Sequence, residues 1–262
     1  MRDIGRNRGA RNRASDTANS MQRLLNPRVD RRSLDRRVAD ALREEILSGR
    51  FPPGFRLVET WLAQQLQVSR GTVRAALSEL THQGLVDQVA YTKWSVPDLR
   101  AQDAWELYTL RASLEGLGSS LAAEAVTAAS GAELSASFDR LVESAAVGEV
   151  GPAVEADLAL HKTIVALSGH GRLIKQYEIL EQQLRRYMRS SNALMHDTRE
   201  IGNQHRPLVE AILAGQAAEA EALAKSHNMT EGRKLYTKLL QIEQRAASAT
   251  VSPEPKPIEL RS

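Results

Sequence analysis

The chain has 262 residues, no cysteine and a formal net charge of +3. The absence of cysteine excludes disulfides and cysteine-based zinc sites. No apolar run approaches the roughly 18–20 residues that a membrane-spanning helix needs, and the N-terminus has no hydrophobic segment typical of signal peptides. We therefore expect a cytoplasmic protein without a membrane partner. A chain of this length can form two domains, each with its own hydrophobic core.

Positive charge is concentrated at the N-terminus. Residues 1–32 contain nine arginines and three aspartates, a net charge of +6, so the remaining residues sum to −3. This segment is rich in Asn, Gly and Ser and poor in apolar residues, which predicts a disordered arm. Such an arm either keeps the protein in solution or adds sequence-independent contacts to DNA phosphates. Residues 248–262, which include three prolines, are expected to form a second disordered tail.

Residues 33–97 have the pattern of three helices followed by a β-hairpin. Ser69 is a good N-cap for the third helix, because its hydroxyl can accept a hydrogen bond from a free N–H of the first turn. Glycines stop the first and third helices, and two apolar runs predict the strands. In chain order, these elements are expected at residues 34–46, 61–66, 70–83, 85–89 and 92–96. Their order predicts a winged helix-turn-helix.

The third helix presents two arginines away from its apolar face. Arg70 and Arg74 are four residues apart and lie off the buried stripe, so they project from the same side. Two cations in the first turns of a helix repel each other and oppose the positive end of the helix dipole. DNA phosphates and base edges would compensate for both effects. The pattern therefore favours DNA recognition, while a helical domain with an exposed basic face is the alternative.

This region resembles the DNA-binding domain of GntR-family transcription regulators. The resemblance covers residues 34–97 and rests on Gly54-Phe55-Arg56-Leu57, Val68-Ser69-Arg70, Val73-Arg74-Ala75-Ala76-Leu77 and Gly84-Leu85-Val86. It implies that Ser69, Arg70, Thr72 and Arg74 face DNA, and that the hairpin reaches the adjacent minor groove. Lys93 is the candidate contact there. The hairpin tip departs from the family pattern, because Ala90-Tyr91-Thr92-Lys93-Trp94 replaces a Gly-rich tip.

After a linker at residues 98–102, the pattern is helical throughout residues 103–247. Glycines and prolines divide this region into segments with one apolar face each, which predicts an all-α bundle of six or seven helices and a mainly α protein. We expect Pro207 in the first turn of a helix that ends at Gly215. The Arg185-Arg186 pair is expected on a helix surface.

Four polar residues of this second domain form a candidate metal site. Asp157 and His161 are four residues apart, so both side chains leave the same face of one helix. His205 and His227 lie on later helical segments. One carboxylate and three imidazoles suit a first-row divalent metal, with zinc as the default and nickel, manganese or iron as other candidates. Spacing alone also allows ordinary hydrogen-bonded histidines of a helical core.

The second domain resembles the FCD ligand-binding domain of the FadR-type branch of the same family. The resemblance rests on Leu107-Tyr108-Thr109-Leu110-Arg111 with Glu115, on Asp157-x-x-Leu160-His161, and on His205 followed 22 positions later by His227. It implies a divalent metal held by Asp157, His161, His205 and His227, beside a pocket for a small carboxylate. Arg111 matches an arginine of the effector pocket, and His170, which stands where the family often has Asn, is the second candidate contact to the effector. Without the resemblance, Arg111 would instead pair with Glu115 on its own helix.

These features predict a transcription regulator, specifically a repressor, and not an enzyme. It would bind a palindromic operator in double-stranded DNA as a homodimer, and a small organic acid in the metal-containing pocket would control its affinity for DNA. Two alternatives stay open. One is a helical metalloenzyme with a DNA-binding appendage, because an Asp/His metal set can activate water. The other is a repressor that senses the metal directly.

Overall fold

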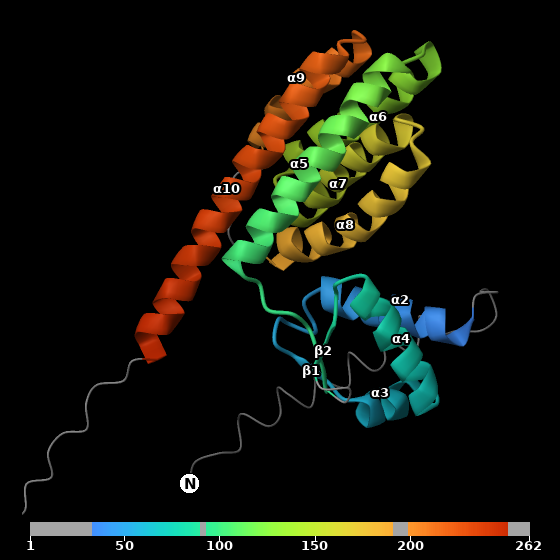
Figure 1. Cartoon of the computed structure of the whole chain (residues 1–262), viewed down its shortest axis with the longest axis vertical. Coiled ribbons are helices and arrows are strands. Elements are labelled where there is room, and N and C mark those ends of the chain that lie inside the picture. The colour runs from blue at the N-terminus through green and yellow to red at the C-terminus, as the bar shows by residue number, and fades with distance from the viewer. Residues whose placement is uncertain (1–32, 90–92, 191–198, 251–262) are drawn as a thin grey trace, which may run out of the picture.

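The structure is a computed structural model that describes residues 33–89, 93–190 and 199–250. The basic arm at 1–32, the hairpin tip at 90–92 and residues 251–262 of the C-terminal tail lie outside the described residues. Figure 1 shows a small N-terminal domain that contains the β-sheet, and a longer helical bundle beside it.

The N-terminal domain has the predicted winged helix-turn-helix architecture. Ser69 caps its third helix, because its Oγ accepts a hydrogen bond from the N–H of Thr72 at 3.1 Å. The helices are α2 (Leu34–Leu47), α3 (Glu59–Leu66) and α4 (Arg70–His82), and the strands are β1 (Arg56–Leu57), β2 (Asp87–Val89) and β3 (Lys93–Ser95). Leucines, valines and alanines from all three helices form its core together with Trp94 of β3.

The sheet contains a strand that the sequence pattern did not indicate. It is antiparallel with the order β1-β3-β2, and Leu57 of β1 pairs with Trp94. The predicted hairpin is the β2–β3 pair, in which Gln88 also pairs with Trp94. With only two residues, β1 is too short for an alternating pattern of apolar and polar side chains to be visible in the sequence.

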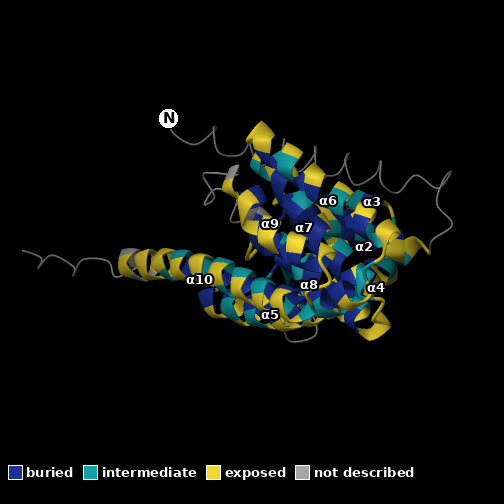
Figure 2. Cartoon of the chain, turned by 90° about the horizontal axis from the view of Figure 1, so that it is seen from above, coloured by how far each residue is buried: buried dark blue, intermediate teal, exposed yellow. Residues whose placement is uncertain are grey.

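The described part of the second domain contains six helices, within the predicted range. They are α5 (Ala101–Glu124), α6 (Ala128–Val147), α7 (Val150–Leu167), α8 (Gly171–Ser190), α9 (Arg199–Leu213) and α10 (Ala217–Thr250). Helix α10 packs chiefly along α5, and its C-terminal part extends beyond the bundle and is exposed (Figure 2). Helix α5 starts inside the proposed linker, at Ala101, and α10 continues past residue 247.

The expected position of Pro207 is wrong. Helix α9 starts at Arg199, so Pro207 lies inside the helix and not in its first turn. Proline cannot donate the helical hydrogen bond to the carbonyl four residues earlier, and it is therefore typical of helix starts. Here the apolar face of α9, which includes Ile201 and Leu208, packs into the bundle core on both sides of the proline. Tertiary packing therefore keeps the helix continuous.

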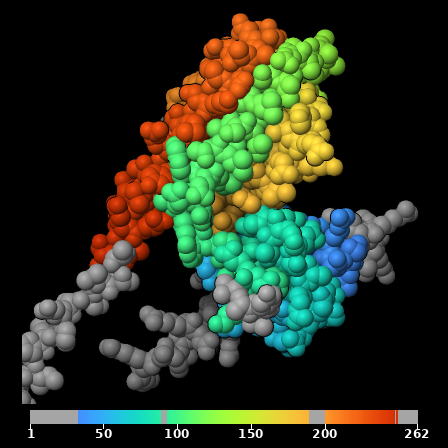
Figure 3. Space-filling model, in the orientation of Figure 1, coloured from blue at the N-terminus to red at the C-terminus, as the bar shows by residue number. Residues whose placement is uncertain are grey.

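Helix α8 connects the two domains. Gln183 Nε2 donates a hydrogen bond to the carbonyl of Gln83 at 3.3 Å. Gly84 allows this approach, because a Cβ at that position would lie 2.5 Å from the Gln183 amide nitrogen. Arg186 Nη1 donates to the carbonyl of Pro97 at 2.7 Å. Figure 3 shows the N-terminal domain packed against this end of the bundle.

Arg186 is buried, with 5% of its surface exposed, so the expectation that both arginines of the Arg185-Arg186 pair lie on a helix surface is wrong. The contact between the domains covers the Arg186 side chain, and a surface of that kind leaves no periodic signal in the sequence. No helix in the described ranges is long and apolar enough to cross a bilayer.

Candidate metal centre and nucleic-acid interface

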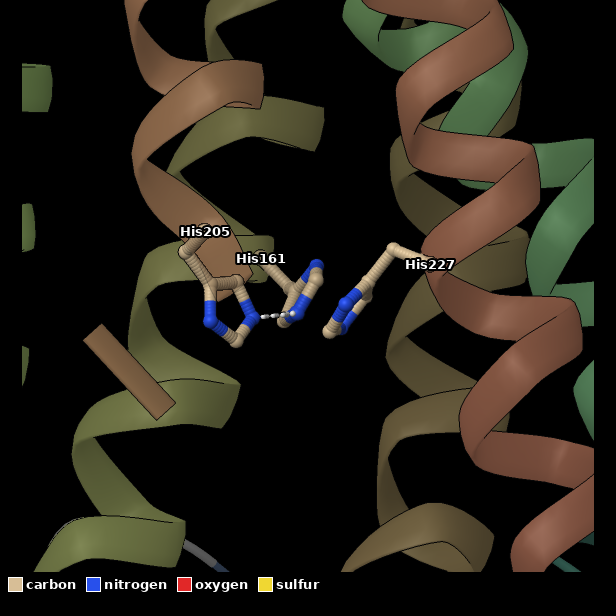
Figure 4. Close-up of side chains that lie close together, drawn as sticks. All are labelled: His161, His205 and His227. Carbon is tan, nitrogen blue, oxygen red and sulfur yellow. Dashed lines mark hydrogen bonds between the residues drawn. The ribbon is translucent and has the colours of Figure 1, made fainter. Parts of the chain in front are cut away.

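Three helices bring three histidines together inside the bundle. His161 comes from α7, His205 from α9 and His227 from α10, and one nitrogen of each ring lies within 4.8 Å of the others. Figure 4 shows the rings directed toward one another. Asp157 joins them from one turn before His161, with its Oδ1 2.9 Å from His205 Nε2 and 3.6 Å from His161 Nε2. All four candidate metal ligands of the sequence therefore meet at one place.

Neighbouring groups determine which ring nitrogens face the centre. His161 Nδ1 lies 2.7 Å from the Glu115 carboxylate, and His205 Nδ1 lies 2.7 Å from the carbonyl of Ile201. Both of these oxygens are acceptors, which favours a proton on each Nδ1, and in a neutral ring this leaves the lone pair on Nε2. The two Nε2 atoms are 2.9 Å apart. Two lone pairs at this distance require a proton or a metal ion between them.

The spacing of these atoms suits a divalent metal. Metal–nitrogen bonds of about 2.1 Å place neighbouring ligand atoms about 3.0 Å apart at right angles and about 3.4 Å apart in the tetrahedral geometry usual for zinc. The distances of 2.9 Å between the Nε2 atoms, 2.9 Å from His205 to Asp157 and 3.6 Å from His161 to Asp157 lie around these values. The three histidine nitrogens lie within 4.8 Å of one another, so side chains would move slightly to share one ion.

The ionisation states favoured for Asp157 and His227 suit a cation, whereas Glu115 outweighs burial and raises the pKa of His161, so a metal ion would have to displace a proton from that ring. Burial alone would raise the pKa of Asp157, but His205 and His161 outweigh it and hold the pKa well below its ordinary value. Burial, together with the neighbouring His205 and His161, lowers the pKa of His227 well below that of a free imidazole. A carboxylate and a neutral imidazole are the forms that bind metal ions.

Glu115 holds the surroundings of the site in place. This buried carboxylate of α5 is within 2.7 Å of four donors: Arg111 Nε, Tyr177 OH, His161 Nδ1 and Asn228 Nδ2. Burial alone would raise the pKa of Glu115, but the charges of Arg111 and His161 hold it below its ordinary value. Glu115 therefore stays ionised and orients His161, as second-layer carboxylates commonly do for metal-binding histidines.

A cavity of about 260 Å³ opens beside the histidines. Arg111 lines it and is buried, and its Nη2 atom has no hydrogen-bond partner among the described residues. The expected pairing of Arg111 with Glu115 is also present, through Nε at 2.7 Å. Burial raises the pKa of Tyr108, on the same wall, to about 12, so its hydroxyl stays protonated. The cavity thus offers a buried cation and a neutral hydroxyl beside the metal ligands.

His170 does not line this cavity. It is exposed at the start of α8, where its Nδ1 accepts a hydrogen bond from the N–H of Leu173 at 3.1 Å. The structure therefore corrects the expected effector role of His170, which instead caps the helix. A position between two helices can face the cavity or solvent, and the sequence alone did not distinguish the two.

The expected DNA-contacting residues lie at the exposed start of α4. The hydroxyls of Ser69 and Thr72 are 2.8 Å apart. The Arg70 and Arg74 side chains are 63% and 58% exposed, so both are accessible to DNA. Lys93 is exposed at the start of β3, directly after the hairpin tip that lies outside the described residues.

Sequence reasoning missed Glu59, which pairs with both arginines. Arg74 donates to its carboxylate through Nε at 3.0 Å and Nη2 at 2.8 Å, and Arg70 Nη2 lies 3.9 Å away. Trp94 Nε1 donates to the same carboxylate at 2.9 Å. Glu59 is 15 residues before Arg74, and no spacing rule for a single helix connects them. The two arginines therefore have a partner inside the protein before DNA is bound.

Comparisons with known proteins identify both domains. The family model described as bacterial regulatory proteins, gntR family, matches residues 34–89, and the FCD domain model matches residues 106–229. The chain belongs to the GntR family. Its fold is a GntR winged helix-turn-helix followed by a helical FCD domain, and the family assigns it to DNA-binding transcription regulators rather than to enzymes.

Several curated proteins are similar to this GntR regulator. A probable D-xylose utilization operon transcriptional repressor of Paenarthrobacter nicotinovorans is 29% identical over 76% of this chain and 88% of its own length. The transcriptional repressor GlaR of Escherichia coli is 27% identical over 72% of this chain and 90% of its own length. The Nta operon transcriptional regulator of Aminobacter aminovorans is 33% identical over 53% of this chain and 66% of its own length.

Solved structures share the architecture of both domains. Escherichia coli McbR/YncC matches with a TM-score of 0.67 at 22% identity, over 79% of this chain and 99% of that chain. A GntR regulator from a Rhodococcus species matches with a TM-score of 0.62 at 25% identity, over 77% of this chain and 96% of that chain. At sequence identities this low, the similarity to these two structures establishes a shared fold and no more.

Proposed function

We propose that this GntR regulator is a repressor that binds a palindromic operator as a homodimer and responds to a small organic acid at a divalent metal site. The observation that carries the proposal is the convergence of three imidazoles and Asp157 on the cavity that Arg111 lines. A volume of about 260 Å³ suits a small organic molecule and is below the usual range for larger ligands.

Asp157, His161, His205 and His227 would hold the metal ion. Zinc is the first candidate, and nickel, manganese or iron accept the same donors. When bound, the ion supplies positive charge and a coordination position that a carboxylate oxygen can occupy. Glu115 and the carbonyl of Ile201 keep the rings of His161 and His205 in the orientation this requires.

Arg111 would bind the carboxylate of the acid. Glu115 engages its Nε edge at 2.7 Å, which fixes the plane of the guanidinium group. Its Nη2 atom is buried without a partner in the described part of the chain, so a ligand carboxylate would satisfy it. Leaving such a group unpaired costs free energy, and this favours a ligand with an acceptor oxygen over one without.

Arg70 and Arg74, with Ser69 and Thr72, would contact DNA from the start of α4, and Lys93 would reach it from the hairpin. In a homodimer, two copies of α4 would enter successive major grooves, about 34 Å apart for half-sites one helical turn apart. An acid that binds one dimer arrangement better than the other would shift the equilibrium between DNA-bound and free protein. Helix α8 links the domains through Arg186 and Gln183 and would transmit this change.

The experiment is a DNA-binding titration of metal-loaded protein on an operator selected from random duplexes. We expect a palindromic selected site, a dimer on that site by sedimentation, and a weaker complex when a small carboxylate is added. Elemental analysis of the purified protein identifies the metal. If metal alone releases the operator and no acid has an effect, the direct metal-sensing alternative holds. If the Asp157→Ala variant binds metal and responds to acids like the parent, the proposed site is wrong.

A further inference from the structure

Helix α5 has a stripe of exposed residues along its outer side. Five residues at intervals of three and four share this side of the helix: Asp103, Glu106, Leu110, Ser113 and Leu117. Other sides of α5 pack on α10, α7 and α8. Leu110 and Leu117 are 52% and 44% exposed, although leucines of a helical bundle usually face its core. The stripe therefore contains apolar surface that the described part of this chain leaves open to solvent.

Helix α8 has a second stripe, which lies beside the first. Four residues at intervals of four, three and four share this side of α8: Arg172, Gln176, Ile179 and Gln183. At one end, Gln183 lines the same cavity at the domain junction as Leu110 of α5. At the other end, a Cβ on Gly118 of α5 would lie 3.5 Å from Leu173 of α8. The two helices therefore run side by side in opposite directions, and their stripes form one surface, which we call the α5–α8 face.

The centre of the α5–α8 face is apolar. Ile179 is 42% exposed, similar to the two leucines of the α5 stripe. At a rise of about 1.5 Å per residue from the contact between Gly118 and Leu173, Leu110 lies about 12 Å and Ile179 about 9 Å along the face. The two side chains are therefore at nearly the same height, one on each helix.

The two stripes of the face carry opposite charges. Asp103 and Glu106 are the charged residues of the α5 stripe, and Arg172 is the charged residue of the α8 stripe, with Lys175 exposed one turn further along α8. A second copy that packed α5 on α5 would bring carboxylates together, and like charges across an interface cost free energy. A second copy that packs its α5 on α8 brings the acidic stripe onto the basic one. The face is therefore complementary to itself, as the interface of a two-fold dimer must be.

We propose that the α5–α8 face is the dimerisation surface, in which α5 of each copy lies on α8 of the other about a two-fold axis parallel to these helices. Leu110 of one copy would then contact Ile179 of the other. This arrangement leaves both DNA-binding domains at the same end of the dimer, as a palindromic operator requires. The inference rests on the proposed function, because it locates the interface of the proposed homodimer.

Cross-linking tests the contact between Leu110 and Ile179 directly. The chain has no cysteine, so introduced thiols report the contact without background. Full-length Leu110→Cys protein mixed with Ile179→Cys protein should form a disulfide-linked dimer with one copy of each under mild oxidation, measured by mass spectrometry. The matched control mixes Leu110→Cys with Ile242→Cys, because Ile242 of α10 is also exposed, at 45%, but lies outside the face. The control mixture should give a much lower yield.

Sedimentation of the full chain gives a second, independent measurement. Ile179→Glu should weaken dimerisation at least about tenfold, because it places a charge against an apolar centre. Ile242→Glu should dimerise like the parent, and both variants should keep the parent's melting curve, since both positions are exposed. Unchanged dimerisation of Ile179→Glu, or equal cross-linking of the two cysteine mixtures, would refute this face and leave a homodimer through another surface. A parent that binds its operator as a monomer would refute both this face and the proposed homodimer.

Discussion

Arg74 of the recognition helix α4 makes a two-point salt bridge to Glu59 at the start of α3, with nitrogen–oxygen distances of 3.0 and 2.8 Å. The contact uses the Nε edge of the guanidinium group, so N–H groups of Nη1 and Nη2 stay available for a guanine base. Trp94 of β3 donates to the same carboxylate. One side chain thus connects the recognition helix to the sheet that carries the hairpin, and it orients Arg74 without blocking it.

Replacing Arg74 with alanine should weaken operator binding about ten- to a hundredfold, the usual effect of losing a two-point contact to a base. The side chain is 58% exposed, so thermal stability should change little. Fluorescence anisotropy with a labelled operator measures the affinity, and a melting curve measures the thermal stability. Arg140→Ala, at an exposed position of α6, is the matched control and should bind like the parent. Equal affinity of Arg74→Ala and the parent would show that α4 does not read the operator through this residue.

Glu59→Gln should reduce the preference for the operator over random DNA, because Arg74 loses its charged partner while Trp94 keeps an acceptor. The hydrogen bond from Arg74 lowers the pKa of Glu59 below its ordinary value of 4.5. The ionised carboxylate therefore stabilises the fold above pH 4.5, and this contribution is lost as the pH falls through the lowered pKa. Urea titrations should show the parent more stable than Glu59→Gln at pH 7, with a smaller difference at pH 4 and below. A difference that does not change with pH would contradict the ion pair.

Glu115→Gln should destabilise the protein by roughly 3–5 kcal/mol, because it leaves the buried charge of Arg111 without its partner. Metal affinity should also fall about ten- to a hundredfold, since His161 loses the carboxylate that orients it. Tyr177→Phe removes only one hydrogen bond to the same carboxylate and should cost about 1 kcal/mol. Chemical denaturation and metal titration of both variants give these numbers. Similar losses of stability and metal affinity in the two variants would contradict the role assigned to the negative charge of Glu115.

Removing the metal with a chelator should lower the melting temperature. A metal at a hundred times its dissociation constant adds about 2.7 kcal/mol of stability, which corresponds to roughly 5–10 °C for a domain of this size. His227→Ala should remove most of this response. His82→Ala, at an exposed position of α4, should keep it. Calorimetric melting with and without chelator is the measurement, and an unchanged melting temperature in the parent would argue against a bound metal.

Arg186→Met should weaken the link between the two domains more than it affects either fold. The methionine keeps much of the buried volume but cannot donate to the carbonyl of Pro97. A well-packed apolar residue in place of a buried charge is often neutral for stability. We expect operator binding to persist, while an acid that releases the parent from DNA releases the variant less. The ratio of operator affinities with and without acid is the measurement, and an unchanged ratio would exclude Arg186 from the coupling.

The sequence was sufficient for features that depend on neighbours within one element. The helices of the N-terminal domain follow from apolar periodicity and glycine stops, and the cap of α4 follows from Ser69. Asp157 and His161 share a face because they are four residues apart on one helix. His205 and His227 were candidates as imidazoles on later helical segments, but spacing alone did not distinguish them from ordinary buried histidines, and the resemblance to the FCD domain favoured the metal site.

Only the tertiary structure decided which side chains from different helices meet. The packing of α7, α9 and α10 brings His161, His205 and His227 within reach of one ion, and packing also removes His170 from the cavity. The same holds for Glu59, whose partner lies on another helix, and for Arg186, which the contact between the domains covers. Helical periodicity specifies the face on which a residue lies. The neighbour that this face meets depends on how the helices pack, which involves the whole core.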